Sequence, residues 1–204
     1  MTDISYQLYS SRNFGPIAAT LGMLADAGYA NVEGYGGLFE DASALADLKT
    51  ALSATGLKMP TAHIGFDAVA KDPDGVVALA RDLGIEAVIV PFTENQKRSA
   101  AQWAAFGAAL AEAGKPLQDA GLAFGWHNHA FEFADLGGAD RPLDLILQAS
   151  DTMMFEFDIA WAVVAGEDPG AWTTKYADRL LAVHVKDRAP EGIDAEDGWA
   201  DVGH

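Results

Sequence analysis

Short apolar runs alternate along the chain with longer segments in which apolar residues recur at helical spacing. Runs of about 4–8 apolar residues are typical of strands, and recurrence every three to four residues over roughly ten or more positions is typical of helices. The predicted strands cover residues 4–9, 31–34, 58–64, 87–91, 122–127, 154–159 and 181–185. The predicted helices cover residues 14–27, 41–54, 74–83, 97–120, 142–149 and 169–177. Gly28, Gly56 and Gly84 follow three of these helices and are expected to end them.

Strand and helix repeat as a unit roughly every 30 residues, which is typical of a parallel α/β fold. The strands are nearly continuous apolar runs, such as AVIVP at 87–91, as expected for a sheet covered on both faces. No phosphate-binding glycine loop follows the first strand, which disfavours an open dinucleotide-binding sheet. We therefore predict a (β/α)8 TIM barrel as a single domain over residues 1–204. A complete barrel has eight βα units and typically about 250 residues, so the last unit is expected to be missing from this chain.

Composition narrows the classes of partner. Thirteen Lys and Arg face 30 Asp and Glu, and the resulting net charge of −17 disfavours nucleic acid and anionic membranes as partners. The absence of cysteine excludes disulfides and thiolate metal sites. No signal peptide or membrane-spanning apolar run is visible, so we expect a cytoplasmic protein with a small-molecule substrate. An unclosed barrel would expose strand edges, which makes a homo-oligomer an expected form.

Polar side chains gather where the predicted strands end. They are Glu33, His63, His127, His129 with the nearby Glu132, Asp158, His184 and Lys186. In a barrel these carboxyl ends form one rim, where active sites are built. Four of the five histidines thus lie at positions that the fold is expected to bring together.

Side chains alternate between the two faces of a strand, and this alternation places the polar residues of each strand on the same face. His127 and His129 lie on one face of their strand, as Glu156 and Asp158 do, and as His184 and Lys186 do. Their apolar neighbours are expected to face the helices; they are Trp126, Phe157, Val183 and Val185. Buried polar groups need partners or a metal ion, and a mixed histidine and carboxylate set suits Zn, Mn, Co or Fe better than Mg or Ca.

Three strings carry a resemblance to a known family: GWHNHAFEF at 125–133, FDIAWAVVAGEDP at 157–169 and HVKDR at 184–188. QLYSSR at 7–12 and AGYANVEGYG at 27–36 fit the same pattern. Over nearly its whole length the chain resembles the xylose isomerase-like TIM-barrel superfamily, which includes the AP endonuclease family 2 proteins. The HNH-x-x-EF string resembles its sugar phosphate isomerase/epimerase branch.

The resemblance implies a single divalent metal ion held by carboxylates and a histidine. Asp158 and His184 match the family's ligand positions, and a buried structural pair is the alternative role for them. His127 stands where many members have a ligand glutamate, and Glu132 is the preferred replacement for it. The family's last ligand, a glutamate on the eighth strand, has no counterpart in this chain.

The remaining roles follow from the position of each residue at the rim. His129 and Glu132 are the candidate catalytic bases. The candidate substrate contacts are Glu33, His63, His127, Trp161 and Lys186. Trp161 is equally compatible with stacking on a sugar face and with capping the core. Lys186 could contact the substrate or a phosphate group, or could instead pair with Asp187 or another carboxylate.

The resemblance implies an isomerase or epimerase of a sugar, sugar phosphate or related polyol. The reaction would remove a proton next to a carbonyl and pass through an enediolate, with the metal as Lewis acid. One alternative is a lyase or dehydratase acting on an inosose or keto-sugar, because both reactions begin with the same proton abstraction. A second is a non-catalytic, incomplete barrel acting as a binding or assembly partner. DNA repair of the endonuclease IV type is disfavoured by the acidic composition.

Overall fold

The computed structural model describes residues 3–190 and 198–203, and the chain divides into two compact units. Unit 1 comprises residues 1–90 and 114–123, and unit 2 comprises residues 91–113 and 124–204. The chain passes between the units after residues 90, 113 and 123, and the second of these divisions falls within the long helix α5 (Ala100–Asp119). The single domain over residues 1–204 stays a prediction.

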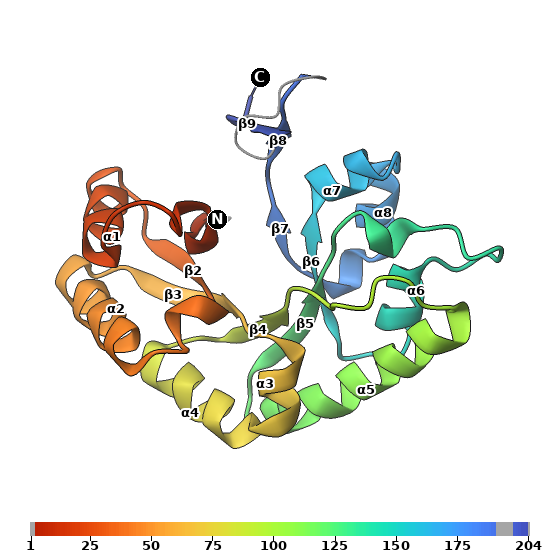
Figure 1. Cartoon of the computed structure of the whole chain (residues 1–204), viewed down its shortest axis with the longest axis horizontal. Helices are drawn as coiled ribbons and strands as arrows, with labels where there is room; N and C mark the ends of the chain where they lie inside the picture. The colour runs from red at the N-terminus through yellow and green to blue at the C-terminus, as the bar shows by residue number, and fades with distance from the viewer. Residues whose placement is uncertain (1–2, 191–197, 204) are drawn as a thin grey trace. The chain divides into compact units, whose positions relative to one another are not determined.

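Unit 1 contains four parallel strands, each paired with the next one along the chain. The strands are β1 (Ser5–Gln7), β2 (Asn31–Tyr35), β3 (Lys58–His63) and β4 (Ala87–Val90). The helices are α1 (Ile17–Asp26), α2 (Ala42–Thr55), α3 (Phe66–Lys71) and α4 (Pro73–Leu83), with short 3-10 turns at Leu8–Ser11 and Gly36–Leu38. Helices α1, α2 and α4 lie along one side of these strands (Figure 1).

The ends of the helices in unit 1 are set by local chemistry. Asp41 caps α2, because its Oδ1 accepts hydrogen bonds from the backbone N–H groups of Ser43 at 2.8 Å and Ala44 at 2.9 Å. Gly56 and Gly84 end α2 and α4 with φ angles of 74° and 71°, a conformation that side chains other than glycine disfavour. The predicted helix ends at these two glycines are confirmed.

Two differences from the prediction in unit 1 have clear causes. Strand β1 ends at Gln7, not at residue 9, because the Gln7 side chain accepts a hydrogen bond from the backbone N–H of Tyr9 and starts a 3-10 turn. Helix α3 was not predicted. It is fewer than two turns long, ends at Lys71, and is supported by an ion pair between Asp67 and Lys71, four residues apart.

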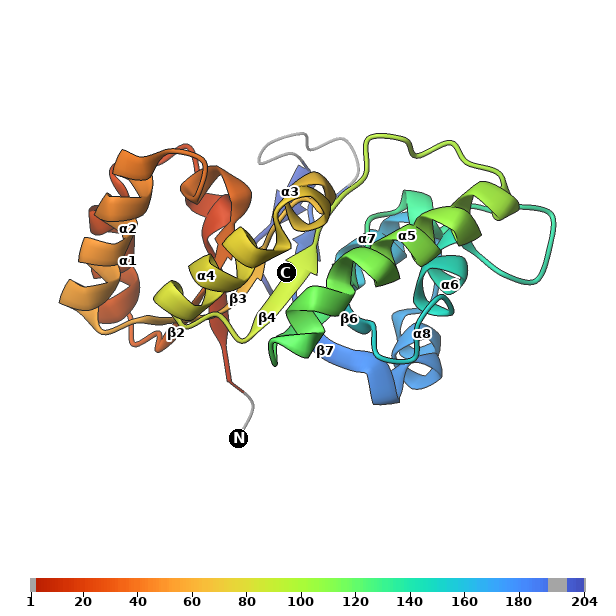
Figure 2. The same ribbon diagram turned by 90° about the horizontal axis from the view of Figure 1, so that it is seen from below.

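Unit 2 contains three more parallel strands, again paired in sequence order. They are β5 (Ala123–His127), β6 (Met154–Asp158) and β7 (Leu180–His184). The helices are α5, α6 (Pro142–Leu147), α7 (Ile159–Val164) and α8 (Pro169–Lys175), with 3-10 turns at Phe131–Phe133 and Ala177–Arg179. Helices α5, α6 and α8 lie on one side of the strands, and α7 lies at the end of β6 (Figures 1 and 2). A short antiparallel pair, β8 (Asp187–Arg188) and β9 (Trp199–Ala200), was not predicted.

The alternation predicted for the strands of unit 2 is largely observed. Trp126 and Phe157 are fully buried, and Trp126 packs edge-to-face against Phe106 of α5 at 5.5 Å. Val183 and Val185 differ from the prediction, because they are 40% and 59% exposed. Within the residues that the structure describes, β7 pairs with β6 alone. No described helix has the length and apolarity needed to cross a membrane.

Candidate active site

The carboxyl ends of three neighbouring strands in unit 2 carry the polar side chains of the candidate site. His127 ends β5, Asp158 ends β6 and His184 ends β7. The strand register places His127 beside Glu156, and Asp158 beside His184. Because residues paired in a parallel sheet point to the same face, this register gathers the four side chains on one side of the sheet.

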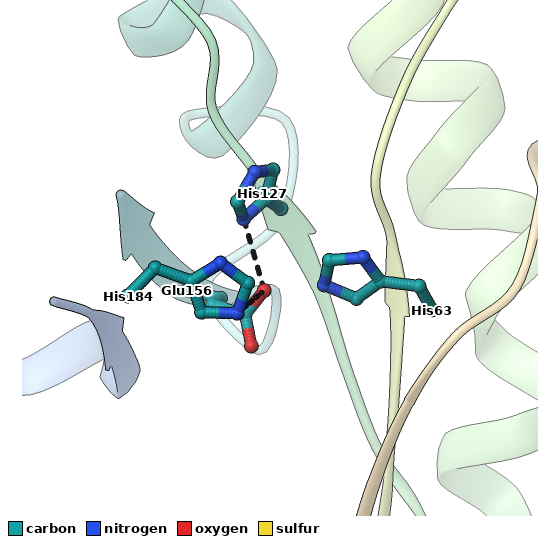
Figure 3. A group of neighbouring side chains, drawn as sticks. All are labelled: His63, His127, Glu156 and His184. Atoms are coloured by element: carbon teal, nitrogen blue, oxygen red, sulfur yellow. Dashed lines mark hydrogen bonds and ion pairs between the residues drawn. The ribbon is translucent and has the colours of Figure 1, made fainter. Parts of the chain in front are cut away.

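Two imidazoles converge on one carboxylate at this position. His127 Nδ1 lies 3.0 Å from Glu156 Oε2, and His184 Nε2 lies 3.3 Å from the same oxygen. Ligand atoms of these three residues all lie within 4.8 Å of one another. Figure 3 shows the three side chains pointing toward one another; His63, which belongs to unit 1, is labelled in the same view.

This group, which we call the donor cluster (His127, Glu156 and His184), has the chemistry of a divalent-metal site. The Glu156 side chain is fully buried, and the side chains of His127 and His184 are only 5% and 14% exposed. A buried carboxylate is stable only when it is paired or bound to a cation. Two imidazoles with one carboxylate suit zinc and related transition metals. Two donors that each bind a metal at about 2.0–2.2 Å lie at most roughly 4.4 Å apart, so small movements of these side chains would bring their ligand atoms within binding distance of one ion.

Asp158 lies beside the donor cluster and has a second role. Its Oδ1 accepts hydrogen bonds from the backbone N–H groups of Ala160 and Trp161, both at 3.1 Å, and thereby caps α7. Burial alone would raise the pKa of Asp158, but His184, Lys186 and His127 outweigh it and hold the pKa at about 2. The cap explains why β6 ends at Asp158 and not at residue 159, as predicted, and why helix α7, which was not predicted, follows at once.

Asn128 joins the ends of β5 and β6, a function that the sequence pattern did not suggest. Its side chain is fully buried. Its Oδ1 accepts a hydrogen bond from the backbone N–H of Asp158 at 2.9 Å, and its Nδ2 donates to the backbone carbonyl of the same residue at 3.1 Å. Its place between two histidines at the end of a predicted strand is the sequence signal that could have marked it. Asn128 therefore sets the position of His127 relative to Asp158.

Glu132 holds the loop after β5 in place. It is fully buried in the 3-10 turn Phe131–Phe133, its Oε1 accepts from Trp126 Nε1 at 3.1 Å, and its Oε2 accepts from the backbone N–H of His129 at 2.8 Å. Neither oxygen belongs to the donor cluster. The predicted roles of Glu132 as metal ligand and base stay predictions, and its hydrogen bonds favour Glu156 as the carboxylate ligand.

The buried Glu132 carboxyl predicts a pH dependence of stability. Burial raises its pKa to about 8 from an ordinary 4.5, against hydrogen bonds that favour the ionised form. Between these values unfolding releases a proton, so the free energy of unfolding should fall as pH rises, with a slope approaching about 1.4 kcal/mol per pH unit. Glu132→Gln should remove this contribution, as seen in denaturant titrations from pH 5 to pH 8.

Glu167→Gln is the matched control for this measurement. Glu167 also accepts an indole N–H, from Trp172 at 3.0 Å, but its side chain is 25% exposed. Its replacement should leave the slope close to that of the wild type. Equal slopes for the wild type and Glu132→Gln would show that Glu132 is ionised in the folded protein throughout this range.

His129 and Trp161 extend the site with aromatic groups. The His129 ring lies 5.1 Å from the His127 ring and 5.3 Å from the Trp161 ring, and it stacks on Phe131 at 5.8 Å. Unlike Glu132, His129 is only partly buried. Lys186 pairs with Asp158, with its Nζ 2.9 Å from Oδ2. Of the two roles left open for Lys186, the structure therefore shows carboxylate pairing.

Glu33 and His63 contact each other within unit 1. Both are buried, Glu33 in the middle of β2 and His63 at the end of β3. His63 Nε2 lies 3.4 Å from Glu33 Oε1, and Thr61 donates a hydrogen bond to Glu33 Oε2 at 2.6 Å. Their predicted contact with substrate stays a prediction.

Within unit 2, most of the predicted site residues lie together. They are His127, His129, Asp158, Trp161, His184 and Lys186. Glu156 joins them as the carboxylate of the donor cluster, although the sequence indicated only the face of the strand on which it lies.

Comparison with known proteins identifies the family of the chain. Residues 21–203 match the xylose isomerase-like TIM barrel family, and the chain belongs to that family. The predicted TIM-barrel class is confirmed, and the described residues contain seven parallel strands where a complete barrel has eight.

Three similar proteins illustrate the range of the likeness. The rhizopine catabolism protein MocC of Rhizobium meliloti is 24% identical over 193 residues, which is 84% of this chain and 58% of the length of that protein. The structure of a sugar phosphate isomerase/epimerase from Parabacteroides distasonis has a TM-score of 0.80 at 22% identity, covering 95% of this chain and 78% of that one. The structure of the IOLI protein with a bound zinc atom has a TM-score of 0.71 at 12% identity, covering 93% and 74%.

Proposed function

We propose that the chain catalyses isomerisation or epimerisation of a sugar or related polyol, with a divalent metal ion held by His127, Glu156 and His184. The observation that carries the proposal is the buried donor cluster at the ends of three neighbouring strands. Family membership and the zinc atom in the structure of IOLI support it. The metal would polarise a substrate carbonyl and lower the pKa of the adjacent C–H group.

His129 is the side chain best placed to move the proton. It is partly exposed and adjoins both His127 and Trp161, so a substrate at the donor cluster would lie beside it. Imidazole is the side chain whose ordinary pKa lies nearest neutrality, which suits a group that first removes and then returns a proton. Glu132 is less suited, because both of its oxygens are occupied by buried hydrogen bonds. Lys186 would contact a substrate oxygen while remaining paired with Asp158.

The test is exchange of substrate C–H for deuterium in heavy water, followed by mass spectrometry and NMR on a panel of ketoses and inososes. The metal-loaded wild type should exchange the proton next to the carbonyl and yield an isomer or epimer, and removal of the metal by a chelator should abolish both. His129→Gln should retain the metal and reduce exchange at least about 100-fold, the usual scale for loss of a general base. Metal-dependent exchange that His129→Gln leaves unchanged would exclude His129 as the base.

The same experiment separates the isomerase from the lyase. Elimination of water from the same intermediate would produce an enone with strong ultraviolet absorbance and a product lighter by one water. Deuterium exchange without formation of an enone would support the isomerase. An enone as the main product would show that the enzyme is a lyase. Absence of exchange with every substrate, on protein shown to hold metal, would contradict both.

A further inference from the structure

The 3-10 turn Phe131–Phe133 follows the two histidines of the candidate site, and its two phenylalanines pack against different neighbours. Phe133 is 4% exposed and meets Trp172 edge-to-face, with ring centroids 5.0 Å apart. Phe131 is only partly buried and stacks on the His129 ring, with centroids 5.8 Å apart and ring planes at 12°. Of these two side chains, Phe131 is therefore the one that contacts the proposed proton-transfer residue.

The same turn fixes the backbone of His129 but not its side chain. Glu132 Oε2 accepts a hydrogen bond from the backbone N–H of His129 at 2.8 Å, and Glu132 Oε1 is held by Trp126 Nε1 at 3.1 Å. These bonds place the Cα atom of His129 and leave the two side-chain torsions undetermined. Rotation about χ2 of histidine has broad minima, so the plane of the imidazole depends on the groups that pack against it.

Four aromatic rings of unit 2 contact the His129 imidazole, and they do so at different angles. Phe131 lies nearly parallel to it, whereas the planes of the other three rings are inclined at 76°, 79° and 41°; they belong to Phe92, His127 and Trp161. A nearly parallel ring restricts rotation about χ2, because rotation would drive the edge of the imidazole into the face of its neighbour. The contact with Phe131 is therefore the one that sets the plane of the His129 ring.

Phe131 is in turn held by a buried residue of helix α5. The Trp103 ring is 1% exposed and stacks on Phe131, with centroids 6.1 Å apart and ring planes at 19°. The guanidinium of Arg98 lies 4.7 Å from the centroid of the Trp103 ring and donates a hydrogen bond to Thr93 Oγ1 at 3.0 Å. This cation–π contact and the helix hold Trp103, so Phe131 rests on a support that does not depend on bound substrate.

We infer that Phe131 is a positioning residue for proton transfer: its ring sets the plane of the His129 imidazole and thereby the direction in which a ring nitrogen meets the substrate. The inference rests on the proposed function, which makes His129 the base. His129 lies outside the donor cluster, so a metal ion bound there would not fix this imidazole, and the ring needs another support. Misplacement of a reacting group by about 1 Å can cost on the order of 100-fold in rate, so this contact should have a measurable effect.

Kinetics of the metal-loaded protein supply the first test, with the ketose or inosose that the wild type exchanges in heavy water. Phe131→Leu keeps an apolar side chain but has no ring plane, so kcat should fall about tenfold or more while KM stays within about twofold of the wild type. Phe131→Tyr keeps the ring and should restore most of kcat. In a His129→Gln background, Phe131→Leu should cause no further decrease, because its effect passes through His129.

NMR supplies a second test that does not depend on turnover. The His129 ring signals are identified by their loss in His129→Gln, and nuclear Overhauser effects from these protons to Phe131 and Trp161 are measured in the zinc-loaded and metal-free wild type. We expect both contacts in the wild type. In Phe131→Leu the contact with Trp161 should weaken, because the imidazole is free to take other orientations, and Phe131→Tyr should preserve it.

Phe133→Leu is the matched control for both tests. Phe133 is the same residue type in the same turn, but it packs against Trp172. Its replacement should lower the melting temperature and leave kcat and the contact between His129 and Trp161 close to those of the wild type. Circular dichroism and metal content, measured on each variant, separate a local effect from loss of the fold.

Three results would overturn the inference: unchanged kcat and ring contacts in Phe131→Leu, an equal loss of kcat in Phe133→Leu, or an equal further loss when Phe131→Leu is added to His129→Gln. Each of them, with exchange by the wild type, would leave the proposed function intact. Absence of exchange by the wild type would instead contradict the proposed function. In that case, a contact between His129 and Trp161 that is lost in Phe131→Leu and kept in Phe133→Leu would still support the positioning of His129 by Phe131.

Discussion

Replacement of Glu156 by glutamine should lower the affinity for a divalent metal on the order of 100-fold or more and abolish metal-dependent turnover. Glu156 is the one carboxylate of the donor cluster, and its Oε2 receives both imidazoles, at 3.0 Å and 3.3 Å. Loss of a hydrogen-bonding partner of a ligand typically costs 10–100-fold in metal affinity, so loss of a ligand itself should cost at least the upper end of that range. Glutamine keeps the shape and removes the charge, which isolates the electrostatic contribution.

The measurement is calorimetric titration with Zn²⁺ and Mn²⁺, with bound metal counted by mass spectrometry after dialysis. Glu167→Gln serves as control, because Glu167 is a partly buried carboxylate of the same unit that lies outside the donor cluster. Metal affinity in Glu156→Gln within about threefold of the wild type would mean that the three side chains form a buried ion-pair network and not a metal site.

Replacement of Asn128 by alanine should be among the most destabilising single changes in unit 2. The backbone N–H and carbonyl of Asp158 would both lose their partner in a fully buried position. Unsatisfied buried polar groups cost about 1–3 kcal/mol each, so we expect the two groups together to lower the free energy of unfolding by roughly 2–6 kcal/mol. For a chain of this size that corresponds to a decrease of roughly 4–24 °C in the melting temperature.

Asn128→Asp distinguishes the two hydrogen bonds. The ionised aspartate keeps an acceptor for the N–H of Asp158 but has no donor for its carbonyl, so the loss of stability should be large at a pH where the introduced carboxyl is ionised. At a pH where the introduced carboxyl is protonated, its O–H can donate to that carbonyl, so the loss should be smaller. Asn95→Ala is the control, because Asn95 is exposed and its side chain accepts only a local hydrogen bond from the backbone of Lys97. The free energy of unfolding of each variant is measured by thermal and denaturant unfolding followed by circular dichroism. A decrease of less than about 1 kcal/mol in Asn128→Ala would show that the ends of β5 and β6 are held together without this side chain.

The parts of the site that follow a strict sequence period could be predicted, and the parts that depend on loop geometry could not. Period-two alternation was enough to separate His127 from Trp126 and Asp158 from Phe157, because consecutive strand residues point to opposite faces. The same alternation placed Glu156 on the face of Asp158. It could not show that Asp158 also caps α7, a use of its carboxylate that depends on where the strand ends.

Contacts between residues far apart in the chain also lay beyond the sequence pattern. Glu132 was attractive as a ligand because it follows the two histidines closely, but a 3-10 turn directs its carboxylate back to Trp126 and His129. Trp199 reaches Trp161 only through the two-residue pairing of β8 with β9, which is too short to leave a recognisable alternation.

The three members of the donor cluster come from three successive strands, and this has a consequence for the amount of protein in a cell. An ion bound to His127, Glu156 and His184 would act as a cross-link between the ends of β5, β6 and β7. Each tenfold rise in free metal above the dissociation constant would add about 1.4 kcal/mol to the stability of the folded state. Because proteases degrade unfolded chains, scarcity of the metal would lower the abundance of the protein as well as the activity of each molecule.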